Sequence, residues 1–191
     1  VFINNIMPNL YNSFSVMLLG LFGGPVSNGL LDAGNRFVSI SQQFMNIISR
    51  TFFPFLSRRI EKHSSFAKLS IFTSLIFSVL LFITSPLLIK LFFTYEFNDS
   101  IILLQILSIS VFFISTRNVY GINYMIIEGF EKQLRNIITL GSIIGFILSF
   151  PLIYYFKHVG AAINIVLTQA VMCLLVTYKA KKIIKSKINN I

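Results

Sequence analysis

The stretch Leu69–Ile89, LSIFTSLIFSVLLFITSPLLI, carries no charged residue and lies between Lys68 and Lys90. A helix rises about 1.5 Å per residue and the hydrocarbon core of a bilayer is about 30 Å thick, so about 20 apolar residues are enough to cross it. We therefore interpret this stretch as a transmembrane helix.

Further stretches on both sides of it meet the same test. Asn136–Phe156, Val159–Tyr178 and Val1–Leu31 are uncharged. Within Val1–Leu31, a turn signal made of Gly-Gly-Pro at Gly23–Pro25 and Ser-Asn-Gly at Ser27–Gly29 is expected to end a first helix near Phe22. We expect an all-α integral membrane protein with both termini cytoplasmic. The chain 1–191 forms a single bundle with six spans at about 2–22, 30–56, 69–89, 100–127, 136–156 and 159–178, followed by a basic tail at 179–191.

The composition supports the membrane assignment. Hydrophobic residues make up 55% of the chain and charged residues 12%, whereas a soluble domain is about a quarter charged. The net charge of +10 raises the alternative of nucleic-acid binding, but the basic residues lie at the ends of apolar runs instead of alternating with aromatic residues. No nucleic-acid partner is expected.

The basic residues also predict an orientation. Eleven of the sixteen fall on one side of the expected bundle: Arg58, Arg59, Lys62, Lys68, Lys132, Arg135, Lys179, Lys181, Lys182, Lys185 and Lys187. The other side has Lys90 and Lys157, with Glu96 and Asp99 in its loops. By the positive-inside rule, the first side is cytoplasmic, and both termini lie there.

The second predicted span carries a long polar face. Steps of three and four residues align its polar side chains: Asp32, Asn35, Arg36, Ser39, Gln42, Gln43, Asn46, Ser49 and Arg50. Phe37, Ile40, Phe44 and Ile47 are expected on the opposite face. A polar stripe of this length does not suit acyl chains, so we expect it to line a hydrated cavity or a buried polar seam.

Two other spans share this character to a smaller degree. The first has Asn5, Asn9 and Asn12 at similar spacing, and the fourth has polar residues on one face: Gln105, Ser108, Thr116, Tyr120 and Asn123. The third, fifth and sixth spans are nearly all apolar, and we expect them to form a lipid-facing scaffold.

Three arginines lie within predicted spans. Arg36 is one helical turn after Asp32 and is placed to pair with it. Arg50 is close enough to the span end to extend to the headgroups. Arg117 is far from both ends, and Glu128 is the carboxylate on its own helix. Because charge inside a membrane usually serves function, all three are candidate substrate ligands.

The sequence does not suggest an enzyme. His63 and His158 are isolated in predicted loops and are interpreted as solvated, and Cys173 is interpreted as packing within an apolar run. We see no phosphate-binding loop and no converging Ser, His and Asp. No cofactor or metal is expected.

Several strings resemble a known family. Leu31–Phe37 (LDAGNRF), followed at helical length by Thr51–Arg58 (TFFPFLSR), resembles polysaccharide flippases of the Wzx type, which belong to the multidrug/oligosaccharidyl-lipid/polysaccharide exporter superfamily. Pro86–Phe113 looks like that family's helix, outer loop and next helix. The Gly-Ala-Ala-Ile string at Gly160–Ile163 is similar to its recurring turn. Members have about twice as many spans, in two bundles, so this chain resembles the carboxy-terminal half.

The resemblance implies translocation of a polyprenyl-pyrophosphate-linked oligosaccharide, such as an O-antigen repeat unit, across the cell inner membrane by alternating access. Arginine suits pyrophosphate, and Asn, Gln and Tyr suit sugar hydroxyls. The implied partners are membrane lipid, the lipid-linked oligosaccharide, and an amino-terminal half or a second copy. The candidate substrate-binding residues are Arg36, Arg117, Arg50, Asn12, Asn35, Gln43, Asn46, Tyr120 and Asn123.

Three alternatives remain open from the sequence. A cation-coupled multidrug exporter of the same superfamily would hold a carboxylate deep in a bundle, whereas Asp32 and Glu128 are near span ends. A membrane-bound polymerase or acyltransferase would need a large outer loop, and the outer loops here are short. The third alternative is an inactive fragment of a flippase.

Overall fold

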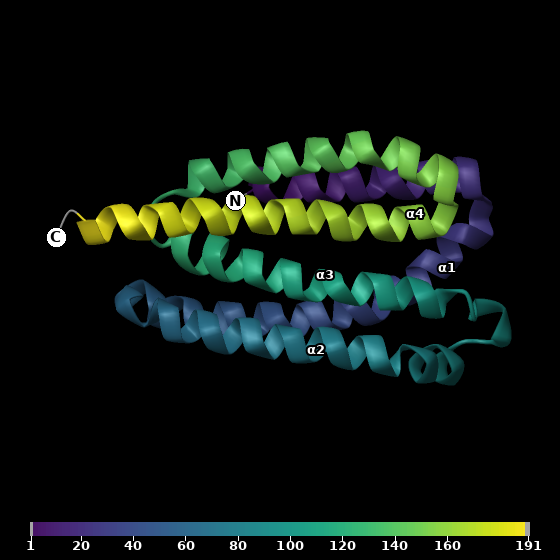
Figure 1. The fold of residues 1–191 in the computed structure, drawn as a ribbon, viewed down its shortest axis with the longest axis horizontal. Coiled ribbons are helices and arrows are strands. Elements are labelled where there is room, and N and C mark those ends of the chain that lie inside the picture. Colours follow the sequence, from purple (N-terminus) through teal and green to yellow (C-terminus); the bar gives the residue numbers. More distant parts are fainter. Residues whose placement is uncertain (1, 190–191) are drawn as a thin grey trace.

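The structure, a computed structural model, describes the backbone of residues 2–189 and the side chains of residues 13–186. Within residues 2–189 the chain is helical apart from short turns, and no strand is present (Figure 1). The elements in chain order are α1 (Phe2–Arg58), the 3-10 turn η1 (Ile60–Lys62), α2 (His63–Phe92), the 3-10 turn η2 (Tyr95–Phe97), α3 (Ser100–Tyr120), the π-helical turn η3 (Gly121–Ile126) and α4 (Glu131–Asn189).

Helix α1 contains the first two predicted spans and bends between them at Gly24. This residue has φ 77° and ψ 173°, a conformation that glycine adopts without a Cβ clash. Pro25 follows, and proline fits the first position of a helix because its fixed φ is already helical. The expected turn over Gly23–Gly29 was too long: one residue with positive φ redirects the chain, and helix resumes at Pro25 instead of near Leu30.

Helix α4 contains the last two predicted spans and bends at Lys157, which has φ 46° and ψ −125°. Such a backbone is costly for a residue with a side chain and persists where the surroundings fix it. Gly160 makes room for the bend, because a Cβ at this position would lie 1.9 Å from the carbonyl oxygen of Leu152. After the bend, α4 continues through the basic segment to Asn189.

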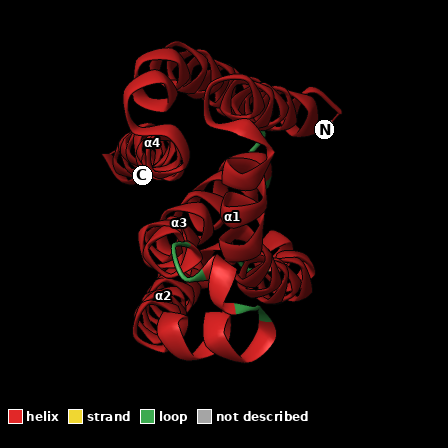
Figure 2. Cartoon of the chain, turned by 90° about the vertical axis from the view of Figure 1, so that its right-hand side faces the viewer, coloured by secondary structure: helices red, strands yellow, loops and turns green. Residues whose placement is uncertain are grey.

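The two bends divide the molecule into two groups of helical segments. The first part of α1 lies with both parts of α4, whereas the second part of α1 lies with α2 and α3 (Figures 1 and 2). Aromatic contacts join the first group. The ring centroids of Phe14 and Phe146 are 4.3 Å apart, and those of Phe22 and Tyr154 are 5.5 Å apart.

Serine hydroxyls join the second group at close helix crossings. Ser100 of α3 donates to the carbonyl oxygen of Leu30 on α1 over 2.9 Å. Ser78 of α2 donates to the carbonyl oxygen of Ser108 on α3, also over 2.9 Å. Small polar residues of this kind let helices approach closely inside a membrane and satisfy their own hydroxyls against backbone.

The core is centred on α3. Leu103, Leu104 and Leu107 are fully buried there and pack with residues of α1, α2 and α4. The second part of α4 also faces inward, because Ala162, Met172 and a further series of its residues are fully buried. The expectation that the sixth span is a lipid-facing scaffold is therefore wrong for this face of α4.

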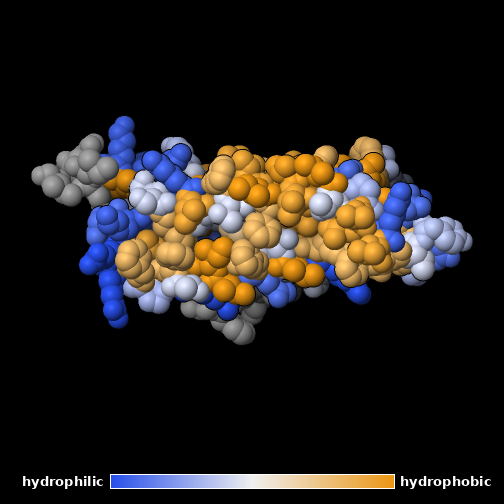
Figure 3. All heavy atoms as spheres, turned by 90° about the horizontal axis from the view of Figure 1, so that it is seen from below, coloured by the Kyte–Doolittle hydropathy of each residue, from blue (hydrophilic) through white to orange (hydrophobic). Residues whose placement is uncertain are grey.

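The outer surface is apolar along its middle. Large hydrophobic side chains of α2 are exposed, among them Phe72, Ile76, Ile83 and Leu87. Figure 3 shows apolar residues covering the central part of one face and hydrophilic residues gathered towards both ends. In the described part, four helices are long and apolar enough to cross a membrane: Ser13–Arg58, Ile60–Phe92, Ser100–Ile126 and Glu131–Ser186. The protein is a multi-pass membrane protein.

The segments at the two ends of the bundle differ in charge. The η1 turn, the connection from η3 to α4 and the C-terminal part of α4 lie at one end (Figure 1), and these segments carry most of the basic residues. The η2 turn and both bends lie at the other end, and that end includes Glu96 and Asp99.

Candidate polar site

The polar face of the second part of α1 divides into two edges. Arg36, Gln43 and Arg50 form one edge at steps of seven residues, and all three are exposed. Ile40 and Ile47 lie between them and are 64% and 63% exposed, so the expectation that these isoleucines lie on the opposite face is wrong. Seven residues are nearly two helical turns, which places all five side chains along one line.

Arg36 is paired at this exposed edge as its spacing predicted. Its Nε donates to Oδ2 of Asp32 over 3.0 Å, and the side chains of Arg36 and Asp32 are 68% and 62% exposed. The pair neutralises the arginine without burying it, so both groups remain accessible to another molecule or chain. An exposed polar edge of this kind is not expected on a helix that faces lipid, because charged groups inside a membrane are costly.

The other edge of the same face is turned towards α3 and forms a buried polar seam. Asn118 donates from Nδ2 to Oδ1 of Asn46 over 2.9 Å. One turn further, Nδ2 of Asn123 donates to the carbonyl oxygen of Ser49 over 2.9 Å, and the Ser49 hydroxyl donates to Oδ1 of Asn123. Asn123 is fully buried, and these bonds give both its amide nitrogen and its amide oxygen a partner.

Asn123 lies in the π-helical turn η3, which continues α3. A π turn widens the helix by one residue and is frequent at functional sites, because it re-aims the side chains around it. Here it places the Asn123 amide against Ser49 while Tyr120, one turn earlier, remains half-buried.

Arg117 joins α3 to α4. Its Nη1 donates to Oε1 of Gln169 over 2.8 Å and lies 3.3 Å from the sulfur of Met172. Gln169 is 6% exposed and was not among the candidates from the sequence. The sequence feature that could have identified Gln169 is a short polar face on the sixth span. Asn164 and Thr168 lie one turn apart on this span, next to Gln169, and both are fully buried.

Both histidines differ from expectation. His63 is 4% exposed, and its Nε2 donates to the carbonyl oxygen of Val119 over 3.0 Å, so it is a buried helix residue and not a solvated loop residue. Its ring packs against Tyr120 and Tyr124, with centroids 5.7 and 5.0 Å away. His158 is half-buried in α4, with Nδ1 3.5 Å from the Ser27 hydroxyl.

The structure thus brings together only some of the candidate residues. Asn46 and Asn123 belong to the buried seam, and Arg36, Gln43 and Arg50 share the exposed edge of α1. Arg117 and Tyr120 lie on α3, where Arg117 contacts α4 and Tyr120 contacts the start of α2. The remaining candidates are Asn35, which is half-buried, and Asn12, whose side chain lies outside the described residues.

A metal site is not formed by the residues whose side chains are described, because no three of their His, Cys, Asp or Glu side chains come together. The polar groups are amides, hydroxyls and guanidiniums. Such groups bind hydroxyl-bearing and anionic ligands through hydrogen bonds.

Comparisons with known proteins agree with the resemblance. The chain is 31% identical over 180 residues to a protein of Escherichia coli (strain K12) named "Putative O-antigen transporter", and 27% identical over 172 residues to one of the same name from Shigella dysenteriae. These alignments cover 90% and 87% of this chain but 43% of each relative. No family model matches the chain, and no solved structure matches it. The predicted resemblance is confirmed to the extent that both relatives are named O-antigen transporters, and the chain spans less than half of the length of each.

Proposed function

We propose that this chain, similar over most of its length to proteins named as O-antigen transporters, is the carboxy-terminal half of a flippase for polyprenyl-pyrophosphate-linked oligosaccharide. The substrate moves from the cytoplasmic to the outer leaflet of the inner membrane by alternating access, and an amino-terminal half or a second copy completes the cavity. Both relatives are named transporters, which favours transport over catalysis.

The proposed topology has six spans and both termini in the cytoplasm. The bends at Gly24 and Lys157 divide α1 and α4 into two spans each, and α2 and the combined α3 and η3 supply the other two. The gathering of basic segments at one end supports a cytoplasmic assignment of that end by the positive-inside rule.

The observation that carries the proposed function is the exposed polar edge of α1. Arg36, Gln43 and Arg50 lie along one line on a helix of membrane-spanning length, and nothing in the described part of the chain covers them. Charged groups facing lipid are costly, so this edge requires another surface opposite it. In a two-bundle transporter that surface is the other half, and the space between them is the substrate cavity.

The chemistry of the edge fits the proposed substrate. Guanidinium groups bind pyrophosphate oxygens bidentately, and Arg36 is accessible because its pairing with Asp32 is exposed. Asp32 neutralises Arg36 in the empty cavity, and the pyrophosphate replaces it when substrate binds. Gln43 and the half-buried Asn35 supply amides for sugar hydroxyls.

Complementation tests this proposal. The chain, alone and fused to the amino-terminal half of the Escherichia coli relative, is expressed in cells that lack their O-antigen flippase, and surface O-antigen is measured. We expect the fusion to restore O-antigen and Arg36→Ala to reduce it at least tenfold at equal protein level. Lys90→Ala, which removes an exposed cation from α2, is the matched control and should retain activity. A correctly inserted fusion that restores nothing would overturn the proposal.

A further inference from the structure

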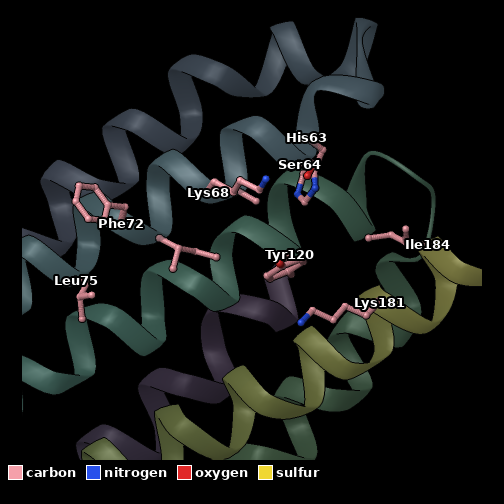
Figure 4. A pocket seen from close by; sticks show the side chains of 10 residues that line it. His63, Ser64, Lys68, Phe72, Leu75, Tyr120, Lys181 and Ile184 are labelled. Carbon is pink, nitrogen blue, oxygen red and sulfur yellow. The ribbon is translucent and has the colours of Figure 1, made fainter.

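A pocket of about 540 Å³ lies at the basic end of the bundle, between the beginning of α2, the end of α3 and the C-terminal part of α4 (Figure 4). Small-molecule sites in proteins range from about 300 to 1,000 Å³, so the pocket is large enough for a ligand. It is distinct from the exposed edge of α1, which contributes none of its lining residues. The lining residues are His63, Ser64, Ala67, Lys68, Ile71, Phe72, Leu75, Tyr120, Lys181 and Ile184.

One part of the pocket is cationic. Lys68 of α2 and Lys181 of α4 extend from opposite sides of the pocket, with Tyr120 between them (Figure 4). Both lysines are exposed, and none of the lining residues is acidic. Two ammonium groups around one space, without a carboxylate to neutralise them, favour an anion there.

The other part is apolar and extends along α2. Ile71, Phe72 and Leu75 follow Lys68 within two turns, in the direction of the uncharged run Leu69–Ile89. Phe72 and Leu75 are 62% and 46% exposed, so this wall is open to the surface that faces lipid. A ligand here therefore has an anionic group at the membrane boundary and an apolar chain that points into the bilayer.

A hydrogen bond joins two of the elements that line the pocket. His63 is buried and donates to the carbonyl oxygen of Val119, which fixes its ring against Tyr120. This bond links the start of α2 to the end of α3, the elements that carry Lys68 and Tyr120.

We propose that this pocket binds an anionic phospholipid of the surrounding membrane. The phosphate lies between Lys68 and Lys181 and accepts a hydrogen bond from the Tyr120 hydroxyl, and one acyl chain packs on Ile71, Phe72 and Leu75. A free phosphate ion would leave the apolar wall unused. Basic pockets between transmembrane helices on the cytoplasmic side are suited to anionic headgroups.

Lipid binding to the purified full chain tests the proposal. Native mass spectrometry would count bound dioleoylphosphatidylglycerol and dioleoylphosphatidylcholine, added at equal concentration to protein stripped of lipid. We expect phosphatidylglycerol to bind at least tenfold more tightly. A contribution of about 1 kcal/mol per lysine corresponds to about a fivefold loss for Lys68→Gln or Lys181→Gln and about 25-fold for the double variant.

Matched controls separate this site from general surface charge. Lys132→Gln and Lys182→Gln remove exposed cations from the same end of the molecule, and neither residue lines the pocket. They should keep the preference for phosphatidylglycerol. Phe72→Ala should weaken the binding of both phospholipids to a similar degree, because it removes a contact with the acyl chain and leaves the charge of the pocket unchanged.

Three results would overturn the proposal. The first is equal binding of the two phospholipids by the unaltered chain. The second is loss of the preference in the control variants to the same extent as in the Lys68 and Lys181 variants. The third is displacement of phosphatidylglycerol by undecaprenyl pyrophosphate at a tenth of its concentration, which would make the pocket a substrate site. These measurements need no transport, so their failure is separate from failure of the proposed function.

Discussion

Arg117 of α3 donates a hydrogen bond over 2.8 Å to the side-chain oxygen of Gln169, which lies on α4 and is 52 positions further along the chain. The bond crosses between the two groups of helical segments and gives one N–H of the half-buried Arg117 an acceptor. Hydrogen bonds to charged groups contribute about 1.5–3 kcal/mol, more than bonds between neutral groups. Arg117 therefore stabilises the packing of α4 on α3, in addition to placing a positive charge inside the bundle.

Removing the acceptor should destabilise the chain. We expect Gln169→Leu to lower the free energy of unfolding by about 1–3 kcal/mol, because one N–H of Arg117 is left without its oxygen. Gln43→Leu is the matched control, since Gln43 is exposed on α1. Unfolding by SDS in mixed micelles measures the free energy of unfolding of both variants. Equal stability of the two would contradict this role of Gln169.

The seam between α1 and α3 should show direct coupling between its amides. In a double-mutant cycle of Asn46→Ala and Asn118→Ala, we expect an interaction free energy of about 0.6 kcal/mol and at most about 1.7 kcal/mol, as found for hydrogen bonds between membrane helices. A cycle of Gln43→Ala and Asn118→Ala should give about zero, because no hydrogen bond joins that pair. Coupling of equal size in both cycles would mean that the 2.9 Å bond is not the cause.

The bend in α4 should depend on the absence of a side chain at residue 160. A Cβ there would lie 1.9 Å from the carbonyl oxygen of Leu152, so Gly160→Ala should cost about 1–3 kcal/mol of unfolding free energy. Gly29→Ala is the matched control, because a Cβ at Gly29 meets nothing within 4 Å and the residue is helical. Alanine should be neutral or stabilising there by up to about 1 kcal/mol. Thermal unfolding in detergent measures the stability of the Gly160→Ala and Gly29→Ala variants.

Arg36 should matter for transport and not for stability. Its pair with Asp32 is exposed, and exposed pairs contribute at most about 1 kcal/mol. Arg36→Ala should therefore leave the melting temperature of the purified chain nearly unchanged while reducing complementation by the fusion at least tenfold. A large loss of stability would instead mean that the effect on transport reports unfolding.

The proposed orientation can be read from labelling of single cysteines. Cys173 is the only cysteine in the chain, so Cys173→Ser gives a background in which Thr94→Cys and Ser64→Cys probe the two ends. With a membrane-impermeant maleimide on spheroplasts, we expect Thr94→Cys to be labelled and Ser64→Cys to be labelled only after lysis. The reverse pattern would place the basic end outside.

A large part of the fold was predictable because the signals for membrane helices are local. Uncharged runs such as Leu69–Ile89 are long enough to cross a bilayer, and backbone groups inside a bilayer must be bonded within their own helix. The same holds for the Arg36–Asp32 pair, because residues four apart on a helix are neighbours whatever surrounds them. The length of the turn at Gly24 was predicted less well, since sequence marks a breaker but not how many residues the bend needs.

The candidate site was predictable only in part. The polar face of α1 was found from its spacing, but Ile40 and Ile47 were placed wrongly, because each follows a residue of the exposed edge by four positions and therefore shares that edge. Spacing does not say which edge of the polar face another helix covers, so the buried seam against α3 was not predicted. Gln169 was missed because the apolar residues of the sixth span outweigh its few polar ones, and the partner of Gln169 lies on another helix.

Composition, helix-length apolar runs and charge placement thus determined from sequence that this protein is a helical membrane protein with a polar face on its second span. Tertiary structure alone decided that Asn118 meets Asn46, that Arg117 meets Gln169, and that His63 is buried against Tyr120. The physical reason is that these contacts join residues more than 50 positions apart. They depend on which helix faces pack together, and that choice is made by the shapes and polar groups of all the helices at once.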